Sequence, residues 1–223
     1  MLDDERLKLR LRDFAVNTIG LDSKLLTMME PVIWGTIERF SGITFEMILK
    51  ILPFVKTTTL SINEHFIKKG DENHKFAIIG HGLFRVYCIN DEGDEITITL
   101  CKEVDSFTCW EPIFLNQPSE HYMQALEDSL VFYVDYSDLK SLIDHDIELA
   151  RVYYSFILKQ FGHAMRGYQS ALNIKPQERY LDLYNNHPSI LARTPKKIIA
   201  SYIGVTPVSF SRLRKRIQEE NTQ

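Results

Sequence analysis

Apolar side chains recur at alternating spacings of four and three residues between positions 143 and 171. The series comprises Ile143, Ile147, Ala150, Tyr154, Ile157, Phe161, Ala164, Tyr168 and Ala171. A mean spacing of ~3.5 residues puts such side chains on one narrow stripe of a helix, and a stripe of this kind commonly pairs with a second helix. We predict a long helix over residues 143–172 that dimerises through Ile147, Ala150, Tyr154, Ile157, Phe161, Ala164 and Tyr168. The alternative is that this helix simply lies across the rest of the chain, and both arrangements can hold at once.

Between residues 57 and 134 the pattern changes to short runs of Thr, Ile, Val, Tyr and Phe separated by turn residues. The segment INDEGDEITITL is typical of a hairpin, because alternating strand residues flank an Asn/Asp/Gly turn. Roughly six to eight such strands predict an antiparallel jelly roll or barrel. The hollow end of a jelly roll leaves room for a ligand pocket.

Helical spacing precedes this region. Ile33, Ile37 and Phe40 share one stripe, and a second short helix is expected over residues 45–52. Residues 1–30 show no clear period, so we expect a peripheral extension there. The expected fold is therefore α+β, with an extension (1–30), a jelly-roll effector domain (31–142), a dimerisation helix (143–172) and an all-α C-terminal domain (173–223).

The C-terminal segment RTPKKIIASYIGVTPVSFSRLRKRI predicts two helices joined by a tight turn. Thr194 and Thr206 are suited to cap the two helices, and each is followed by proline at the first helical position. Gly204 adopts a left-handed conformation at low cost and would form the turn. Apolar positions such as Ile199, Ile203 and Phe210 can share a core. This arrangement is the helix-turn-helix unit, whose second helix enters the major groove of DNA.

Charge supports the same interpretation. The whole chain has a net charge of −4, yet residues 191–218 hold seven basic residues and no acidic one, so the rest carries −11. A basic end on an acidic body indicates a local site for a polyanion. Arg212 suits bidentate contact with guanine, whereas Arg214, Lys215, Lys197 and Thr206 suit phosphates. The residues expected near base edges are Pro207, Val208, Ser209, Ser211 and Arg212.

The remaining composition excludes several classes. Cys88, Cys101 and Cys109 are not paired in a CxxC motif, and no apolar run approaches ~20 residues, so we expect a cytoplasmic protein without a membrane span. The charged start MLDDERLKLRLRDF does not resemble a secretory signal. We expect no enzymatic activity, since the chain has no nucleophile motif, phosphate-binding loop or cluster of residues spaced to bind a metal.

Three segments resemble the Crp/Fnr family of bacterial transcription regulators. They read FIKKGDENHKFAIIGHGLFRVYCINDEGDEITITL, QALEDSLVFYVDYSDLKSLI and ASYIGVTPVSFSRLRKRI. The resemblance runs from about Trp34 to Ile217, and Arg212 matches the arginine with which the family reads DNA. It implies a cyclic-nucleotide-binding-type jelly roll and a homodimer that binds double-stranded DNA. It also implies RNA polymerase as a possible partner and a small-molecule effector.

The sequence departs from the family's binders of cyclic AMP. Those proteins carry a Gly-Glu pair and, some ten residues later, an Arg-Ser or Arg-Thr that holds the cyclic phosphate. Here the region reads VDSFTCWEPIFLNQPSEHYMQA, with Ser119 and Glu120 near the arginine position. A carboxylate repels a phosphate, so we expect no physiological binding of cyclic AMP. An unidentified effector would lie near Trp110, Glu111, Ser119, Glu120, His121 and Tyr122.

Other cofactors of the family are not expected. Its iron–sulfur members use an N-terminal cysteine cluster, and residues 1–87 contain no cysteine. Haem ligands would have to come from His65, His74, His81 or His121, which we interpret instead as surface or hydrogen-bonded residues. The predicted function is a dimeric DNA-binding regulator. The alternative is a ligand-sensing dimer with weak or lost DNA binding that acts through protein contacts, because Pro207 and Val208 replace polar base readers.

Overall fold

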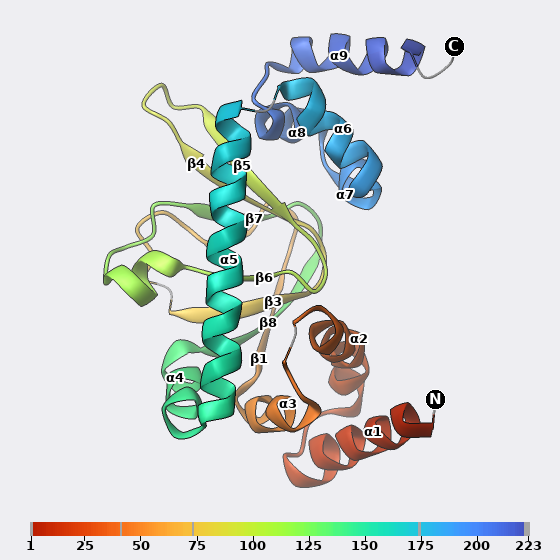
Figure 1. Cartoon of the computed structure of the whole chain (residues 1–223), viewed down its shortest axis with the longest axis vertical. Helices are drawn as coiled ribbons and strands as arrows, with labels where there is room; N and C mark the ends of the chain where they lie inside the picture. The colour runs from red at the N-terminus through yellow and green to blue at the C-terminus, as the bar shows by residue number, and fades with distance from the viewer. Residues whose placement is uncertain (1, 41, 73, 174, 221–223) are drawn as a thin grey trace.

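The computed structural model describes residues 2–40, 42–72, 74–173 and 175–220, and a jelly roll of two four-stranded sheets forms its centre (Figure 1). The strand orders are β1-β8-β3-β6 and β2-β7-β4-β5, and the strand pairs are antiparallel. This confirms the predicted α+β class and the jelly roll. The strands are β1 (Lys56–Leu60), β2 (His65–Ile67), β3 (Lys75–His81), β4 (Phe84–Ile89), β5 (Glu95–Cys101), β6 (Ser106–Thr108), β7 (Tyr122–Ala125) and β8 (Ser129–Asp135).

The predicted hairpin is the β4–β5 connection, and its turn chemistry explains its register. The Asn90 side chain accepts hydrogen bonds from the backbone N–H groups of Glu92 at 3.1 Å and Asp94 at 2.8 Å. Gly93 has φ +86°, a conformation that glycine adopts without steric cost. Ile89 therefore pairs with Glu95 at the end of the two strands.

The N-terminal residues are helical and belong to the core, so the expectation of a peripheral extension is wrong. They form α1 (Leu2–Arg12), a π-helix (Asp13–Thr18) and α2 (Ser23–Arg39), followed by α3 (Phe45–Ile51) and a 3-10 turn (Leu52–Phe54). Leu11 and Ala15 are fully buried in a cluster that includes Leu130 and Phe132 of β8. Asp22 caps α2 by accepting from the N–H groups of Lys24 and Leu25, so this helix starts ten residues before Ile33, the first residue of the expected stripe.

The predicted long helix is two helices, α4 (Tyr136–His145) and α5 (Ile147–Asn173). Asp146 separates them in an extended conformation, and its carboxylate accepts hydrogen bonds from the N–H groups of Glu148 and Leu149 at the start of α5. Lys50 of α3 pairs with the same carboxylate. Ile143 consequently lies on α4 and not on the long helix. The predicted start at residue 143 is therefore wrong, because a capping aspartate interrupts the heptad pattern.

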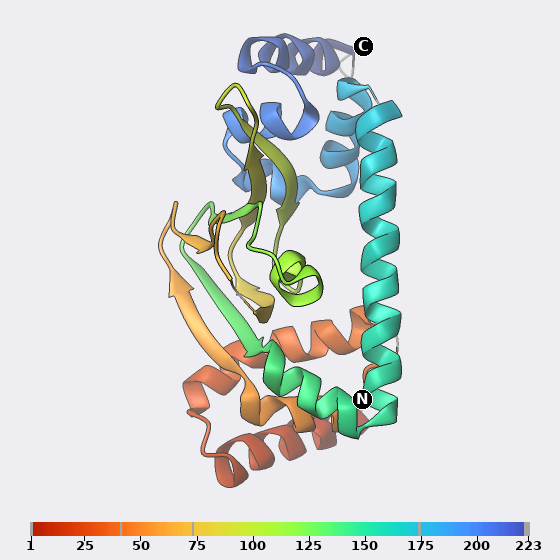
Figure 2. The same ribbon diagram turned by 90° about the vertical axis from the view of Figure 1, so that its left-hand side faces the viewer.

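Helix α5 runs along the jelly roll from the N-terminal helices to a group of C-terminal helices (Figures 1 and 2). That group comprises α6 (Pro176–Asn186), α7 (Pro188–Arg193), α8 (Lys196–Ile203) and α9 (Pro207–Glu220). The two helices predicted on either side of Gly204 are α8 and α9, whereas α7 was not predicted. Helix α8 packs on β5, so the C-terminal helices are joined to the jelly roll by contact as well as by the chain.

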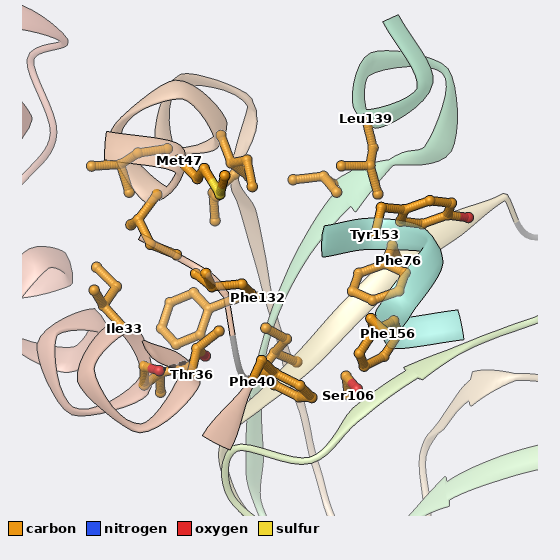
Figure 3. A pocket seen from close by; sticks show the side chains of 18 of the residues that line it. Ile33, Thr36, Phe40, Met47, Phe76, Ser106, Phe132, Leu139, Tyr153 and Phe156 are labelled. Atoms are coloured by element: carbon orange, nitrogen blue, oxygen red, sulfur yellow. Dashed lines mark hydrogen bonds between the residues drawn. The ribbon is translucent and has the colours of Figure 1, made fainter. Parts of the chain in front are cut away.

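The helices leave a cavity of about 160 Å³ on the outer side of the first sheet (Figure 3). Along β3 and β8, Phe76 and Phe132 face this cavity, while their neighbours Ala77 and Val131 face the interior of the jelly roll. Helices α2, α3, α4 and α5 supply the remaining walls. The cavity is thus separate from the hollow of the jelly roll, where the sequence placed the effector.

Candidate nucleic-acid interface

The turn between α8 and α9 is built around one glycine. Gly204 has φ +80° and ends α8, with its N–H bonded to the Ser201 carbonyl at 3.1 Å. The Val205 N–H bonds to the Ala200 carbonyl at 2.9 Å. This pair of bonds is the Schellman arrangement, which satisfies the last carbonyls of a helix and reverses the chain. The predicted turn is therefore confirmed in position and cause.

The first residues of α9 are capped as predicted. Thr206 Oγ1 accepts from the Ser209 N–H at 3.2 Å, and the Phe210 N–H bonds to the Thr206 carbonyl at 2.9 Å. The corresponding prediction for Thr194 is wrong. Pro195 is the N-cap residue of α8, and Thr194 ends α7 with its hydroxyl donated to the Ile190 carbonyl at 2.7 Å. Helix α8 therefore begins at Lys196, one residue later than expected.

One face of this pair of helices is buried. Its fully or almost fully buried members are Ile199, Ala200, Ile203, Phe210 and Ile217, as the apolar pattern predicted. The Phe210 ring meets Tyr180 of α6 edge to face, with ring centroids 5.4 Å apart. The core fixes the rotation of α9, so the side chains on its other face are directed to solvent.

The predicted DNA-contacting side chains form that other face, with one exception. Exposed members are Lys197, Thr206, Pro207, Val208, Ser209, Ser211, Arg212 and Lys215. Arg214 is half-buried beside Tyr180, where its charge opposes the rise in the Tyr180 pKa that burial causes. Lys215 Nζ lies 3.8 Å from the Glu219 carboxylate. The face combines apolar and hydroxyl groups near the start of α9 with exposed positive side chains further along.

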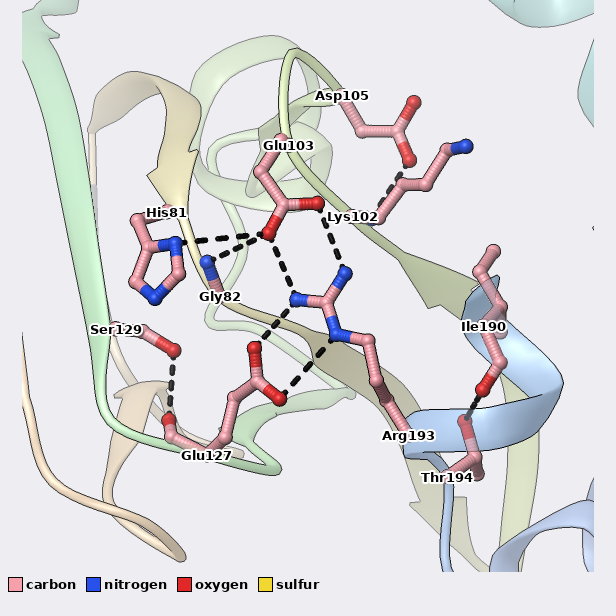
Figure 4. Close-up of polar contacts among 10 residues, drawn as sticks. All are labelled: His81, Gly82, Lys102, Glu103, Asp105, Glu127, Ser129, Ile190, Arg193 and Thr194. Atoms are coloured by element: carbon pink, nitrogen blue, oxygen red, sulfur yellow. Dashed lines mark hydrogen bonds and ion pairs between the residues drawn. The ribbon is translucent and has the colours of Figure 1, made fainter. Parts of the chain in front are cut away.

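Arg193 is one of the seven basic residues of the C-terminal region, but it does not lie on the exposed face of α8 and α9. Its guanidinium forms a bidentate pair with Glu103 at 3.0 and 2.7 Å and a second bidentate pair with Glu127, 3.3 Å away through Nε (Figure 4). Glu103 follows β5, and Glu127 lies between β7 and β8. Arg193 thus joins the C-terminal helices to the jelly roll and is not part of the exposed basic face. Sequence reasoning could not find it, since its partners lie 66 and 90 residues away.

The pKa of Glu103 reflects this contact. Burial by itself raises the pKa of a carboxyl group, but hydrogen bonds from Arg193 and from the Gly82 N–H outweigh it and lower the pKa to about 2. The two carboxylates in turn raise the pKa of Arg193. Glu103 and Arg193 are therefore both charged at neutral pH.

Ser201 of α8 makes a second contact between the same parts. Its hydroxyl donates to the Glu95 carbonyl at 2.8 Å and accepts from the Thr97 N–H at 2.9 Å. Both partners are backbone groups of β5. The hydroxyl therefore takes the place of a neighbouring strand at the edge of the sheet.

The predicted effector residues are only partly brought together. Glu111, Ser119 and His121 form a polar cluster: Glu111 is 4% exposed, and His121 Nδ1 lies 2.6 Å from its Oε1. The Ser119 hydroxyl donates to the His121 carbonyl at 3.1 Å. Trp110 and Glu120 are exposed, and Glu120 pairs with Lys69 at 2.8 Å.

Tyr122, the sixth residue of that predicted set, is stacked on Tyr87. The buried Glu111 carboxylate gives this end of the jelly roll a negative group at its centre. Its partners within the cluster already satisfy it, so the group is a poor receptor for a phosphate.

Helix α5 has two different faces. Leu149, Ala150 and Tyr153 are buried against the domain, and Ile157 is partly buried beside them. Ile147, Tyr154, Leu158, Phe161 and Met165 are exposed by 41–71%. Of the predicted dimer stripe, Ile147, Tyr154, Phe161 and Ala164 are exposed, whereas Ala150 and Ile157 pack within the chain. The Tyr168 side chain lies outside the described part of the structure.

Among the described residues, no group of three or more His, Cys, Asp or Glu side chains is arranged to hold a metal ion. No helix in the described ranges combines the length and the apolar character needed to cross a bilayer.

Comparison with known proteins covers both sequence and fold. Residues 57–146 match the family described as cyclic nucleotide-binding domain. No curated protein matches the sequence significantly. The fold is similar to FixK2 from Bradyrhizobium japonicum, with 16% identity, a TM-score of 0.65 and coverage of 75% of this chain and 86% of that one.

Two other solved structures are similar over more of the chain. The regulator CLP of Xanthomonas campestris has 13% identity, a TM-score of 0.62 and coverage of 84% and 93%. A putative transcriptional regulator of the crp/fnr family from Eubacterium rectale has 16% identity, a TM-score of 0.62 and coverage of 83% and 88%. At these identities the likeness establishes the fold.

Proposed function

Because the chain has the Crp/Fnr fold and carries a cyclic nucleotide-binding domain over residues 57–146, we propose that it is a dimeric, DNA-binding transcription regulator of this type. The observation that carries the proposal is the capped helix α9, whose buried side is fixed by Phe210 and Ile217 and whose other side is basic and exposed. A rigid helix with this division matches the requirement for entry into a major groove.

Contacts to DNA divide by residue type. Arg212 is exposed near the start of α9 and suits the O6 and N7 acceptors of guanine. Val208, 62% exposed, can touch a thymine methyl group. Lys197, Lys215 and the Thr206 hydroxyl suit phosphates, which set affinity and register rather than sequence. The half-buried Arg214 is the weakest member of this set.

Dimerisation is supported by the exposed side of α5. The side chains of Tyr154, Leu158, Phe161 and Met165 follow spacings of four, three and four residues, which is the seam of a two-stranded coiled coil. A second copy of the same helix would cover this stripe isologously. Two α9 helices could then address half-sites ~34 Å apart.

Replacing Arg212 by alanine should reduce affinity for DNA by about tenfold or more, because a bidentate guanine contact is worth ~1–3 kcal/mol. The measurement is fluorescence anisotropy with a duplex selected from a random library by the wild-type protein. Arg6→Ala is the control, since Arg6 is an exposed residue of α1 at the far end of the molecule. Wild-type affinity should also fall steeply with salt. Absent or salt-independent binding would favour a ligand-sensing dimer that acts through protein contacts.

Cyclic AMP should not bind with physiological affinity. By the sequence resemblance, Ser119 and Glu120 are near the position of the family's phosphate-binding arginine, and Glu111 lies buried beside the neighbouring His121. A negative group near a phosphate raises the cost of binding. Isothermal titration calorimetry should give no saturable heat with millimolar nucleotide. A dissociation constant in the micromolar range would contradict this expectation.

A further inference from the structure

The apolar cavity outside the jelly roll has properties of a ligand site. Its volume is about 160 Å³, and it lies between the outer face of the first sheet and helices α2, α3, α4 and α5 (Figure 3). None of the described residues that line it is charged. A molecule that enters it must therefore be uncharged, because a charged group without a partner is costly to bury.

Two hydroxyl groups at the wall, those of Thr36 and Ser106, are already engaged. Thr36 Oγ1 donates to the Val32 carbonyl at 2.7 Å within α2. Ser106 Oγ accepts from Gln160 Nε2 of α5 at 3.2 Å. These bonds leave little for a polar ligand to gain, so the cavity favours a molecule held by apolar contacts.

Aromatic rings define one side of the cavity. Phe156 of α5 meets Phe40 and Phe76 edge to face, with ring centroids 5.1 and 5.4 Å apart. Tyr153 lies beside Phe76 and Phe156, whereas Phe132 lies toward Ile33 and Thr36 (Figure 3). A further ring can therefore meet aromatic side chains from both sides. Met47 on α3 adds a thioether, which packs well on aromatic faces.

From this geometry we propose that the cavity binds one small uncharged aromatic molecule, with a single ring and at most a short alkyl substituent. An apolar cavity of ~150 Å³ in another protein is known to bind benzene and xenon, so the volume is sufficient. Interiors are otherwise close-packed, and the free-energy cost of an empty cavity grows with its volume. A bound ring would restore the missing contacts.

The occupant would touch the first turns of α5. Leu149, Val152, Tyr153 and Phe156 line the cavity from one side of that helix, and Tyr154 and Leu158 of the exposed stripe lie on the other side. The site is therefore placed to respond to, or alter, the position of α5 against the sheet. Binding itself requires neither DNA nor a second copy, so the inference stands apart from the proposed function.

The test uses the full chain with toluene, measured by isothermal titration calorimetry and by thermal unfolding. We expect one saturable site per chain and an increase in melting temperature that follows toluene concentration. Benzoate, which has the same ring with a charge, should cause neither. No saturable binding of toluene to the folded protein, or equal binding of benzoate, would overturn the proposal.

A pair of variants locates the site. Ile33→Phe adds a ring to a cavity-lining position of α2 and should weaken toluene binding by about tenfold or more. Ile37→Phe makes the same change one turn later on that helix, outside the lining set, and should leave binding unchanged. If Ile33→Phe fails to fold, crystals of the wild type under xenon pressure answer the same question. Unaltered binding in Ile33→Phe, or xenon absent from this cavity, would refute the assignment.

Discussion

The double variant Leu158→Glu/Phe161→Glu is expected to be monomeric at concentrations at which we expect the wild-type protein to form a dimer. Leu158 and Phe161 are 71% and 64% exposed on α5, so the substitutions should not disturb the folded chain. In a two-fold pair of helices they would bring four carboxylates into one apolar seam, where unpaired charges are strongly unfavourable. The dimer dissociation constant should rise by about 100-fold or more. Sedimentation velocity over a range of concentrations measures it.

Lys159→Glu is the matched control. Lys159 is exposed on the same helix but lies off the apolar stripe, so the added negative charge should leave the dimer intact. DNA affinity should fall together with dimerisation in the double variant, because each half-site is then bound independently. A dimer unaffected by the double substitution, or a wild-type protein that is monomeric throughout, would show that α5 is not the interface.

Replacement of Arg193 by methionine should lower the free energy of unfolding by about 2 kcal/mol at pH 7. The substitution keeps an unbranched stem but leaves the Glu103 and Glu127 carboxylates facing each other without a cation. Breaking a fully buried ion pair costs ~3–5 kcal/mol, and an exposed pair is worth less than ~1 kcal/mol. Arg193 is 26% exposed and each glutamate 32%, which places this cluster between the two cases.

The effect depends on pH, and its direction follows from the depressed pKa of Glu103. This carboxyl has a pKa of about 2 in the folded chain and an ordinary pKa of 4.5. Its contribution to stability is present above the ordinary value and is lost as the pH falls toward about 2. The difference between wild type and Arg193→Met should therefore be smaller at pH 3 than at pH 7. Urea unfolding at both pH values measures it.

Two controls separate the ion cluster from simple loss of packing. Arg39→Met removes a half-exposed arginine that pairs with Asp105, and it should cost less than ~1 kcal/mol. Adding Glu103→Gln to Arg193→Met should recover part of the lost stability, because one unpaired charge is removed. An equal loss at pH 3 and pH 7, without recovery in the double variant, would mean that the guanidinium acts through packing alone.

Local signals in the sequence were sufficient for most of the fold. The Asn90–Asp94 turn and the turn at Gly204 depend on residues within four or five positions of each other. The local sequence is therefore sufficient to predict both turns. The capping Thr206 and the buried Phe210 follow from the same short-range rules. Alternating strand residues likewise identified the jelly roll, although not the pairing of its strands.

The failures came from places where local patterns compete or where distant residues meet. The heptad pattern of apolar residues continues across Asp146, but the helix does not, because the Asp146 carboxylate caps a new helix there. Leu7, Leu9 and Leu11 alternate like a strand, but Leu11 and Ala15 share the buried face of the N-terminal helices. Ala150 fits the dimer stripe by its spacing, yet its side chain is buried within the chain in a cluster that includes Val134 and Leu139. Arg193 was counted with the basic residues of the C-terminal region, and its role could not be predicted because its two glutamate partners are remote in sequence.

The hydroxyl of Ser201 has a consequence for self-association. β5 ends its sheet, so its outward backbone groups have no neighbouring strand, and Ser201 satisfies two of them from α8. An uncovered strand edge is a template for strand addition by another chain. If the C-terminal helices swing away from the jelly roll, that edge becomes available, and aggregation competes with regulation. Solubility therefore limits how far the C-terminal helices can move from the jelly roll.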